Sequence, residues 1–319
     1  MASEFRQNIV SGEWVLFATD RANRPHAFKP RENNYQPPED CPFEKLEAWH
    51  SSDKITVIPN EFPLVTHSDI CPPIDQRFGF NFIPGNGNHE LVIFRDHERT
   101  FTDFSPTETA EVFTVYKSRY LELAKEPCAA YVSIFHNYGH EAGASIFHPH
   151  SQIITTPILP PDVHRSLHGA AKYYKKNNRE VYDYMTTWSM EQNTRIILKN
   201  DHFVALVPFA ARVPYEVRIY PRKPYPHFET IPDDNLLILA DMFNSIMRKM
   251  KKALHDPAYN FFIHTAPVHD NPEIPSSAYY RWHIEILPHL TQGAGFEFET
   301  GFDVNTVDPE IAAAKLKEA

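Results

Sequence analysis

Hydrophobic residues follow two spacings along this chain, and each spacing predicts one kind of secondary structure. Short apolar runs between turn residues predict β-strands. They occupy residues 14–17, 89–94 and 129–135. Apolar positions at helical spacing predict helices at 105–125, 232–254 and after residue 308, the first with a typical Ser-Pro-Thr-Glu start. Residues 155–195 are polar enough for one or two bridging helices, and 68–88, rich in Pro, Gly and Asn, predicts a loop.

The same order of elements occurs twice. Three segments of the first half have counterparts in the second half at a nearly constant offset. The pairs are Glu90–His97 with Glu216–Lys223, Tyr131–His136 with Tyr259–His264, and Phe147–Ile154 with Tyr280–Leu287. Similarity at a constant offset indicates two copies of one structural unit. Each copy supplies strands for an antiparallel sheet and one packing helix, so we expect an α+β fold divided into residues 1–195 and 196–319.

The composition is that of an ordinary folded protein, with 319 residues of which 42% are hydrophobic and 23% charged. A net charge of -10 argues against a general nucleic-acid-binding protein, because contacts with phosphate backbones need a basic surface. Three cysteines cannot build a disulfide framework. No apolar leader and no run of about 18 apolar residues is present. We therefore expect a cytoplasmic protein with no membrane segment and no nucleic-acid partner.

The most unusual polar positions lie within residues 143–154, which read Gly-Ala-Ser-Ile-Phe-His-Pro-His-Ser-Gln-Ile-Ile. Side chains of an extended strand alternate between its faces, so His148, His150 and Gln152 point to the same side. Imidazole is available unprotonated near neutral pH and can attack phosphorus to form a covalent intermediate. Gln152 and Ser145 could then donate hydrogen bonds to phosphoryl oxygens. The alternative is a strand whose histidines only bond each other or water.

This stretch resembles the active-site signature of the galactose-1-phosphate uridylyltransferase family, within the histidine-triad superfamily. The resemblance implies that His150 is the nucleophile and that His148 is a metal ligand whose backbone carbonyl orients the His150 ring. It also implies two fused histidine-triad-like units, of which the first is catalytic. The second has Arg281, His283 and Glu285 at the matching positions, and we expect it to lack the nucleophile.

Three further residues match family positions that contact phosphate. Arg21 and Arg24 follow the strand at 14–17 in an Arg-Ala-x-Arg-Pro segment that is similar to the opening of family members. Their planar guanidinium groups suit phosphoryl oxygens, although two neighbouring arginines can also be no more than a solvated face. Asn137 precedes His150 at the spacing of a family asparagine that contacts phosphate.

The resemblance also extends to residues that would bind the nucleoside and the sugar. Asn60 and Phe62 lie in an Asn-x-Phe-Pro segment like the one that lines the family's nucleoside pocket. Asn60 can bond a base edge or a ribose, and Phe62 offers an apolar wall. Glu297 lies in Gly293–Gly301, which is similar to the family's sugar-phosphate loop, and could bind hexose hydroxyls. The alternative for this segment is a tight turn between strands.

The resemblance also implies a metal site beside the nucleophile. Cys41 and Glu44 stand in a Cys-Pro-Phe-Glu segment where family members often carry two cysteines. Zinc accepts carboxylate oxygen as well as thiolate, so Cys41, Glu44, His97 and His148 form a candidate structural zinc site. The alternative is that the metal is lost and Cys41 is a buried apolar residue. Relatives with a second metal supply a Glu soon after the His-x-His motif, but residues 160–169 contain none. Where such relatives carry a His-rich motif, this chain offers only His264, His283 and Glu285, so we expect that second site to be absent or weak.

The activity implied by the resemblance is nucleotidyl transfer by double displacement between UDP-glucose and a hexose 1-phosphate, in a homodimer. Two alternatives stay open. The related ADP-glucose phosphorylases also carry Ser at the position of Ser151, which hints at adenylyl transfer to phosphate. A non-catalytic nucleotide-binding protein could also keep the same fold.

Overall fold

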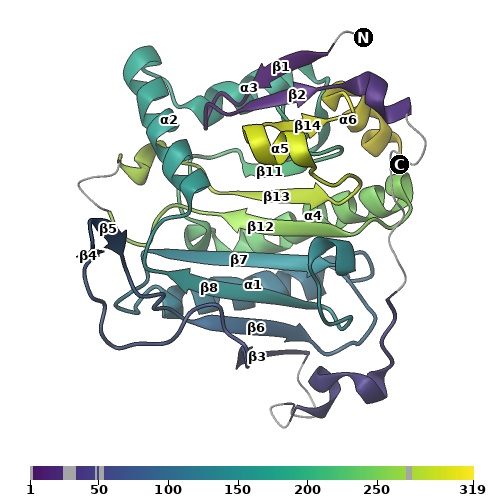
Figure 1. Ribbon diagram of the computed structural model, residues 1–319. Helices are drawn as coiled ribbons and strands as arrows, with labels where there is room; N and C mark the ends of the chain where they lie inside the picture. The colour runs from purple at the N-terminus through teal and green to yellow at the C-terminus, as the bar shows by residue number, and fades with distance from the viewer. Residues whose placement is uncertain (1–2, 24–33, 47–48, 50–53, 271–274) are drawn as a thin grey trace.

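One antiparallel sheet of nine strands runs through the part of the chain that the structure describes (Figure 1). The structure is a computed structural model, and it describes residues 3–23, 34–46, 49, 54–270 and 275–319. In spatial order the strands are β3 (Ile55–Pro59), β6 (His89–Phe94), β8 (His150–Thr156), β7 (Tyr131–Tyr138), β12 (Tyr259–His264), β13 (His283–Pro288), β11 (Val217–Pro221), β10 (Phe203–Leu206) and β9 (Ile196–Lys199). The strands predicted at 89–94 and 129–135 are therefore confirmed.

The two halves of the chain meet at β7 and β12, in the middle of the sheet. Asn137 on β7 lies opposite Asn260 on β12, and Phe135 lies opposite Phe262. From this centre outwards the order is the same in both halves, β7, β8 and β6 on one side and β12, β13 and β11 on the other. The α+β fold class is confirmed, whereas the division after residue 195 stays a prediction.

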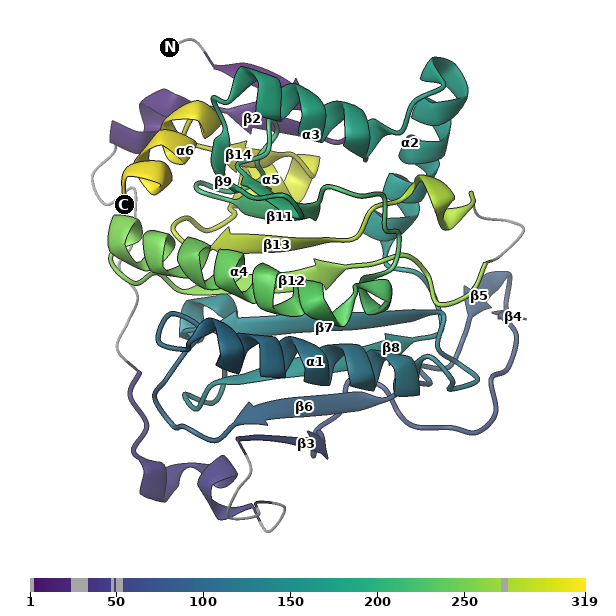
Figure 2. The same cartoon turned by 180° about the vertical axis from the view of Figure 1, so that it is seen from behind.

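Helices α1 (Pro106–Leu123) and α4 (Asp233–Leu254) pack side by side on one face of the sheet (Figure 2). Helix α1 begins as predicted, since the Ser105 side chain accepts a hydrogen bond from the Glu108 N–H and the Glu108 carboxylate accepts one from the Ser105 N–H. Apolar side chains of both helices and of the sheet strands form the main core. Removal of this surface from water is the main force that holds the helices on the sheet.

The remaining helices and strands surround the second half of the sheet (Figure 1). They are β1 (Glu4–Gln7), β2 (Trp14–Phe17), β14 (Asp303–Asn305), α2 (Pro161–Asn177), α3 (Val181–Gln192), α5 (Gly295–Thr300) and α6 (Pro309–Glu318). Strand β2 pairs antiparallel with β1 and parallel with β14, so the beginning of the chain lies against its end. The predicted strand at 14–17, the bridging helices and the closing helix are confirmed.

Two segments differ from their predictions. Residues 68–88 contain a short hairpin of β4 (Asp75–Arg77) and β5 (Phe80–Phe82), with Gly79 at a φ of 82° in its turn. The segment Gly293–Gly301 forms helix α5 and is neither a loop nor a tight turn between strands. Short 3-10 helices lie at η1 (Thr19–Asn23), η2 (Pro38–Asp40), η3 (Pro42–Lys45), η4 (His140–Ala142), η5 (Phe228–Thr230) and η6 (Ser277–Tyr279). None of the helices in the described residues is long and apolar enough to cross a bilayer.

Candidate active site

The strand β8 places the candidate nucleophile in the centre of the first half. His150 is the first residue of β8, between β6 and β7. The side chains alternate as the sequence predicts, because Gln152 contacts His89 of β6 while Ser151 contacts Tyr116 on the opposite side of the sheet. Strand geometry therefore brings His150 and Gln152 to one face.

The His150 ring is held in one orientation by the backbone. Its Nδ1 lies 2.9 Å from the carbonyl oxygen of His148, and this oxygen can only accept, so Nδ1 carries the proton. Nε2 therefore carries the lone pair that a nucleophile needs. The ring is 6% exposed and packs edge-on against Phe43, with 5.1 Å between the ring centroids. Burial lowers the pKa of His150, so the imidazole is neutral at physiological pH.

The predicted nucleoside-binding residues lie in the loop after β3. The Asn60 side-chain oxygen accepts the Phe62 N–H at 2.9 Å, and its amide nitrogen lies 3.1 Å from Nε2 of His89. Phe62 is 80% exposed. The loop is thereby attached to the same histidine that contacts Gln152, and its aromatic side chain stays accessible.

A cavity at the end of β7 reaches His148 and Pro149, the two residues before the candidate nucleophile. Asn137 and Ser145 both line it, as do Gln36, Thr100, His148 and Pro149. Ser145 is exposed in the loop that leads into β8, and Gly143 makes the turn before it with a φ of 85°. Two of the predicted phosphate contacts thus share one cavity.

Two imidazole nitrogens of a Cys/His/His cluster face each other behind the nucleophile. Nε2 of His148 lies 2.5 Å from the Phe94 carbonyl, and Nε2 of His97 lies 2.7 Å from the Gln36 carbonyl. These carbonyls can only accept, so each Nε2 carries the proton and each Nδ1 carries a lone pair. The two Nδ1 atoms lie 3.2 Å apart, and the Cys41 Sγ lies 3.6 Å from Nδ1 of His148. Cys41, His97 and His148 therefore form a cluster that could bind a metal ion.

The chemistry of this donor set fits a bound cation. Two lone pairs at such a distance repel each other unless a positive charge lies between them. The Glu44 carboxylate lies 3.4 Å from Nδ1 of both histidines and completes the four predicted ligands. Two imidazoles, a thiolate and a carboxylate suit tetrahedral Zn²⁺. Burial raises the pKa of the Cys41 thiol, so a bound cation would have to displace its proton.

Ser151 lies in the core and does not face the nucleotide side of the sheet. Its Oγ lies 2.5 Å from the Tyr116 hydroxyl and 3.0 Å from Nδ1 of His136, both fully buried. Burial lowers the pKa of His136 to about 3, so this ring is neutral. The Ser151 hydroxyl thus makes no contact with a base, and adenylyl transfer to phosphate stays open as the alternative activity.

Two other predicted residues lie in elements outside the strands that flank His150, and a third lies outside the described residues. Arg21 is exposed in η1, directly after β2 of the small sheet. Arg24 lies outside the described residues. Glu297 lies in α5, where its carboxylate accepts the Ala294 N–H at 3.0 Å and caps the helix. Contact of Arg21 with phosphate and of Glu297 with a sugar stay predictions.

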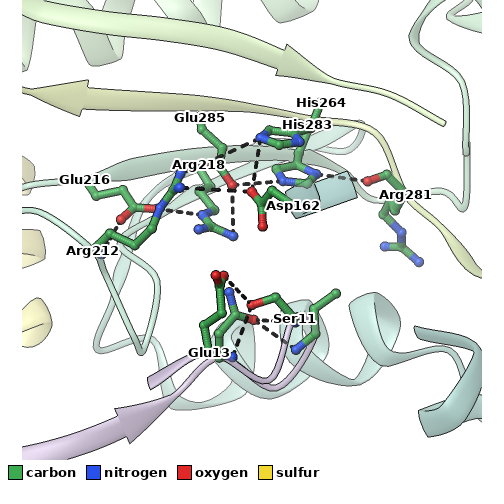
Figure 3. A network of polar contacts seen from close by, with 12 residues as sticks. Ser11, Glu13, Asp162, Arg212, Glu216, Arg218, His264, Arg281, His283 and Glu285 are labelled. Atoms are coloured by element: carbon green, nitrogen blue, oxygen red, sulfur yellow. Dashed lines mark hydrogen bonds and ion pairs between the residues drawn. The ribbon is translucent and has the colours of Figure 1, made fainter. Parts of the chain in front are cut away.

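The second half keeps a histidine at the position that matches His150 (Figure 3). Nδ1 of His283 lies 3.0 Å from the Arg281 carbonyl, which repeats the arrangement in the first half. Beyond the ring the chemistry differs, because Nε2 of His283 lies 3.2 Å from the Glu285 carboxylate. The second half therefore lacks the His-x-His-x-Gln set but not the histidine itself.

Arginines pair the charge of Glu285 in this second cluster. Arg218 lies 3.0 Å from one carboxylate oxygen, and Arg212 bonds the other (Figure 3). Asp162, in the segment that contains no Glu, supplies a carboxylate 3.8 Å from His264. Because guanidinium groups already contact both oxygens of Glu285, a second metal ion would meet two cations there, and this set does not fit it.

Comparisons with known proteins agree with this geometry. The family model described as galactose-1-phosphate uridyl transferase, N-terminal domain, matches residues 1–160. A model for a domain of unknown function matches residues 86–318. The chain is 30% identical to an ADP-glucose phosphorylase of Arabidopsis thaliana, over 99% of this chain and 92% of the relative. It is 27% identical to a galactose-1-phosphate uridylyltransferase of Thermotoga maritima, over 99% of this chain and 98% of the relative.

Solved structures give the same result for the fold. A crystal structure of an ADP-glucose phosphorylase from Arabidopsis thaliana with bound ADP-glucose superposes with a TM-score of 0.82 at 27% identity, over 100% of this chain and 99% of the other. A uridylyltransferase structure superposes with a TM-score of 0.78 at 25% identity, over 99% of this chain and 98% of the other. The fold is thus that of complete proteins of both kinds.

Proposed function

Because the chain belongs to the galactose-1-phosphate uridylyltransferase family, we propose that it is a nucleotidyltransferase that works through a nucleotidyl-histidine at His150. The observation that carries the proposal is the hydrogen bond from Nδ1 of His150 to the carbonyl of His148, 2.9 Å long, which leaves Nε2 with a lone pair. A neutral, oriented imidazole is the state that attacks phosphorus. The donor we propose is UDP-glucose, and the acceptor is a hexose 1-phosphate.

The reaction consists of two displacements at one phosphorus atom. Nε2 of His150 attacks the α-phosphorus of the nucleotide sugar, a P–N bond forms, and hexose 1-phosphate leaves with the bridging oxygen. A phosphate oxygen of a second hexose 1-phosphate then attacks the same phosphorus and releases the histidine. Asn137, Ser145 and Gln152 would donate hydrogen bonds to the phosphoryl oxygens, where negative charge develops in the transition state. We propose Arg21 and Arg24 as further phosphate contacts.

The metal cluster would have a structural role. We propose that Cys41, Glu44, His97 and His148 hold one zinc ion, which supplies a rigid cross-link. His148 would then be a ligand, and it is also the residue whose carbonyl orients His150. The ion would therefore fix the direction of Nε2 and would take no part in the displacement itself.

A second candidate is an ADP-glucose phosphorylase. It is favoured by the relative with 30% identity and by the superposition, with a TM-score of 0.82, on a phosphorylase that holds ADP-glucose. In this reaction the histidine would take AMP from ADP-glucose, and inorganic phosphate would accept it to give ADP. The same residues would serve, and only the base and the acceptor would differ.

One pair of assays tests the proposal and separates the candidates. The first supplies UDP-glucose with galactose 1-phosphate and measures UDP-galactose. The second supplies ADP-glucose with phosphate and measures ADP. We expect turnover in the first assay, and turnover only in the second would favour the phosphorylase. No turnover in either, with retained binding of nucleotide, would support a non-catalytic protein. We further propose that the protein is a homodimer and is cytoplasmic. Size-exclusion chromatography with light scattering tests the oligomeric state.

A further inference from the structure

At the candidate active site, the side-chain oxygen atoms of two amides already accept hydrogen bonds from neighbouring side chains. Gln152 is contacted by His89, and Asn137 is contacted by Asn260. We propose that His89 and Asn260 are positioning residues that lock both amides with their NH₂ groups toward the phosphoryl oxygens of the substrate. This inference rests on the proposed function and deepens it.

The backbone of Leu64 determines the orientation at Gln152. The Leu64 N–H can only donate, and it donates to Nδ1 of His89 at 3.1 Å. Nδ1 is therefore the unprotonated nitrogen, and Nε2 of His89 carries the proton. The Asn60 amide nitrogen, which is a donor, then has its acceptor at Nδ1, 3.4 Å away, and not at the protonated Nε2. Nε2 lies 2.8 Å from Oε1 of Gln152, so it donates to that oxygen. The NH₂ group of Gln152 is then the end that remains for a ligand.

The backbone of Ala142 determines the orientation at Asn137. The Ala142 carbonyl can only accept, and the Asn260 side-chain nitrogen lies 2.8 Å from it. The same nitrogen lies 2.7 Å from Oδ1 of Asn137, so it donates its second proton there. Oδ1 of Asn260 in turn accepts from Nε2 of His289 at 2.5 Å. The NH₂ group of Asn137 takes no part in its bond with Asn260 and remains for a ligand in the cavity that Asn137 and Ser145 both line.

We call these two hydrogen-bonded chains relays: the first runs from Leu64 through His89 to Gln152, and the second from Ala142 through Asn260 to Asn137. Both relays have the same physical consequence. An amide that rotates by half a turn would present its oxygen to a phosphoryl oxygen, and the two would repel each other. Donors that are oriented before the reaction need no reorganisation as charge develops. Removal of one such donor lowers turnover by roughly 100-fold to 1000-fold. A lost relay leaves the donor present but disordered, so we expect a smaller loss of about 10-fold to 100-fold.

The second relay also connects the two halves of the chain. Asn260 and His289 belong to the half without the His-x-His-x-Gln set, and Asn260 lies directly opposite Asn137 where β12 pairs with β7. Asn260, in the second half, would thus influence the reaction in the first half without touching the substrate.

The substitution Asn260→Asp tests this relay with an isosteric change. It removes both amide protons, so Asn137 would turn its NH₂ group toward the new carboxylate and its oxygen toward the substrate. The matched control is Asn305→Asp, because Asn305, like Asn260, donates to a backbone carbonyl, that of Ala211, at 2.9 Å, and it is more deeply buried than the half-buried Asn260. We expect nucleotidyl-adduct formation to slow by about 10-fold to 100-fold in Asn260→Asp and to stay at the parental rate in Asn305→Asp.

A pH profile separates positioning from a general structural defect. When the introduced carboxyl is protonated, its O–H can donate to Oδ1 of Asn137 again. The rate of Asn260→Asp relative to the parent should therefore rise as the pH falls. His289 and Glu141 are titratable groups near this position, and the new carboxylate would contact His289 directly and raise its pKa. Both profiles are therefore measured in a His289→Gln background, where the introduced carboxyl is the titratable group that differs. A ratio that does not change with pH would overturn the second relay.

Two substitutions of His89 test the first relay. His89→Phe keeps a planar ring but removes the donor to Gln152, and we expect a loss in adduct-formation rate of about 10-fold to 100-fold. His89→Gln keeps an amide donor and should recover part of the rate. Equal rates in both variants would overturn this relay. A parent protein that forms no adduct would contradict the proposed function itself, whereas an active parent with unaffected variants would contradict only the relays.

Discussion

The backbone carbonyl of His148 lies 2.9 Å from Nδ1 of His150, and the carbonyl of Arg281 lies 3.0 Å from Nδ1 of His283. In each half, the first residue of the central strand is thus a histidine oriented by the residue two positions before it. The halves differ beyond the ring, where Nε2 of His283 faces Glu285 at 3.2 Å. We therefore expect the same backbone geometry to support covalent chemistry in the first half only.

Loss of one metal ligand should loosen the orientation of His150. Cys41→Ser removes the only thiol of the cluster, so we expect the bound metal to fall well below one ion per chain. Because a bound ion would cross-link His97 and His148, the midpoint of thermal unfolding should fall by several degrees. Elemental analysis and thermal unfolding measure both effects.

The matched control for this prediction is Cys128→Ser. Cys128 is also buried, but it lies outside the cluster and contacts the Ile70 carbonyl instead. Its replacement should leave the metal content unchanged. Full metal content in Cys41→Ser would show that Cys41 is no ligand.

Replacement of Ser151 should change stability and leave base preference unchanged. In Ser151→Ala the buried Tyr116 hydroxyl and Nδ1 of His136 lose their partner. An unsatisfied buried polar group costs about 1–3 kcal/mol, so the free energy of unfolding should fall by about that amount. The ratio of rates with UDP-glucose and ADP-glucose should stay the same. A switch in this ratio would contradict the location of Ser151 in the core.

The buried His136 should make stability depend on pH. Burial lowers its pKa to about 3 in the folded state, whereas an unfolded histidine titrates near about 6.5. Between these values the unfolded chain binds a proton that the folded chain does not, so stability falls as the pH falls below about 6.5. One such group contributes up to about 1.4 kcal/mol per pH unit.

His136→Phe isolates this contribution from that of the other histidines. Urea unfolding of the parent and of the variant between about pH 4.5 and 7 should give a steeper loss of stability in the parent. Equal slopes in the two proteins would mean that His136 does not titrate in this way.

The stability of the protein should be highly sensitive to mutation in the polar cluster around Glu285. Arg218→Met removes one of the two cations that pair the buried Glu285. An uncompensated buried charge typically costs about 3–5 kcal/mol, and we expect a loss of unfolding free energy of that order. Adding Glu285→Gln to Arg218→Met should recover part of it, since one of the two buried carboxylates that Arg218 contacts, Glu285 and Glu216, then carries no charge. Denaturant unfolding of both proteins checks this, and an additive second loss would contradict it.

Local sequence patterns predicted the elements that local physics determines. The start of α1 follows from Ser105 and Glu108, whose side chains cap the helix without any tertiary contact. The shared face of His150 and Gln152 follows from strand alternation alone. The same alternation places Ser151 on the opposite face, where it contacts Tyr116.

Relations between distant segments could not be predicted in this way. The contact of Asn137 with Asn260 depends on the register between β7 and β12, which the chain joins across 120 residues of other structure. His89 carried one usable signal, since it lies two positions from Leu91, the residue opposite Gln152 on the neighbouring strand. The capping role of Glu297 was missed because its segment was expected to be a loop or a turn.

The most direct test of the account is the mass of the acid-sensitive adduct after the protein is mixed with UDP-glucose and no acceptor. We predict one uridylyl group per chain, on the peptide that contains His150, and none in His150→Asn. An adduct on another residue, or equal adduct formation by His150→Asn, would contradict the assignment of the nucleophile.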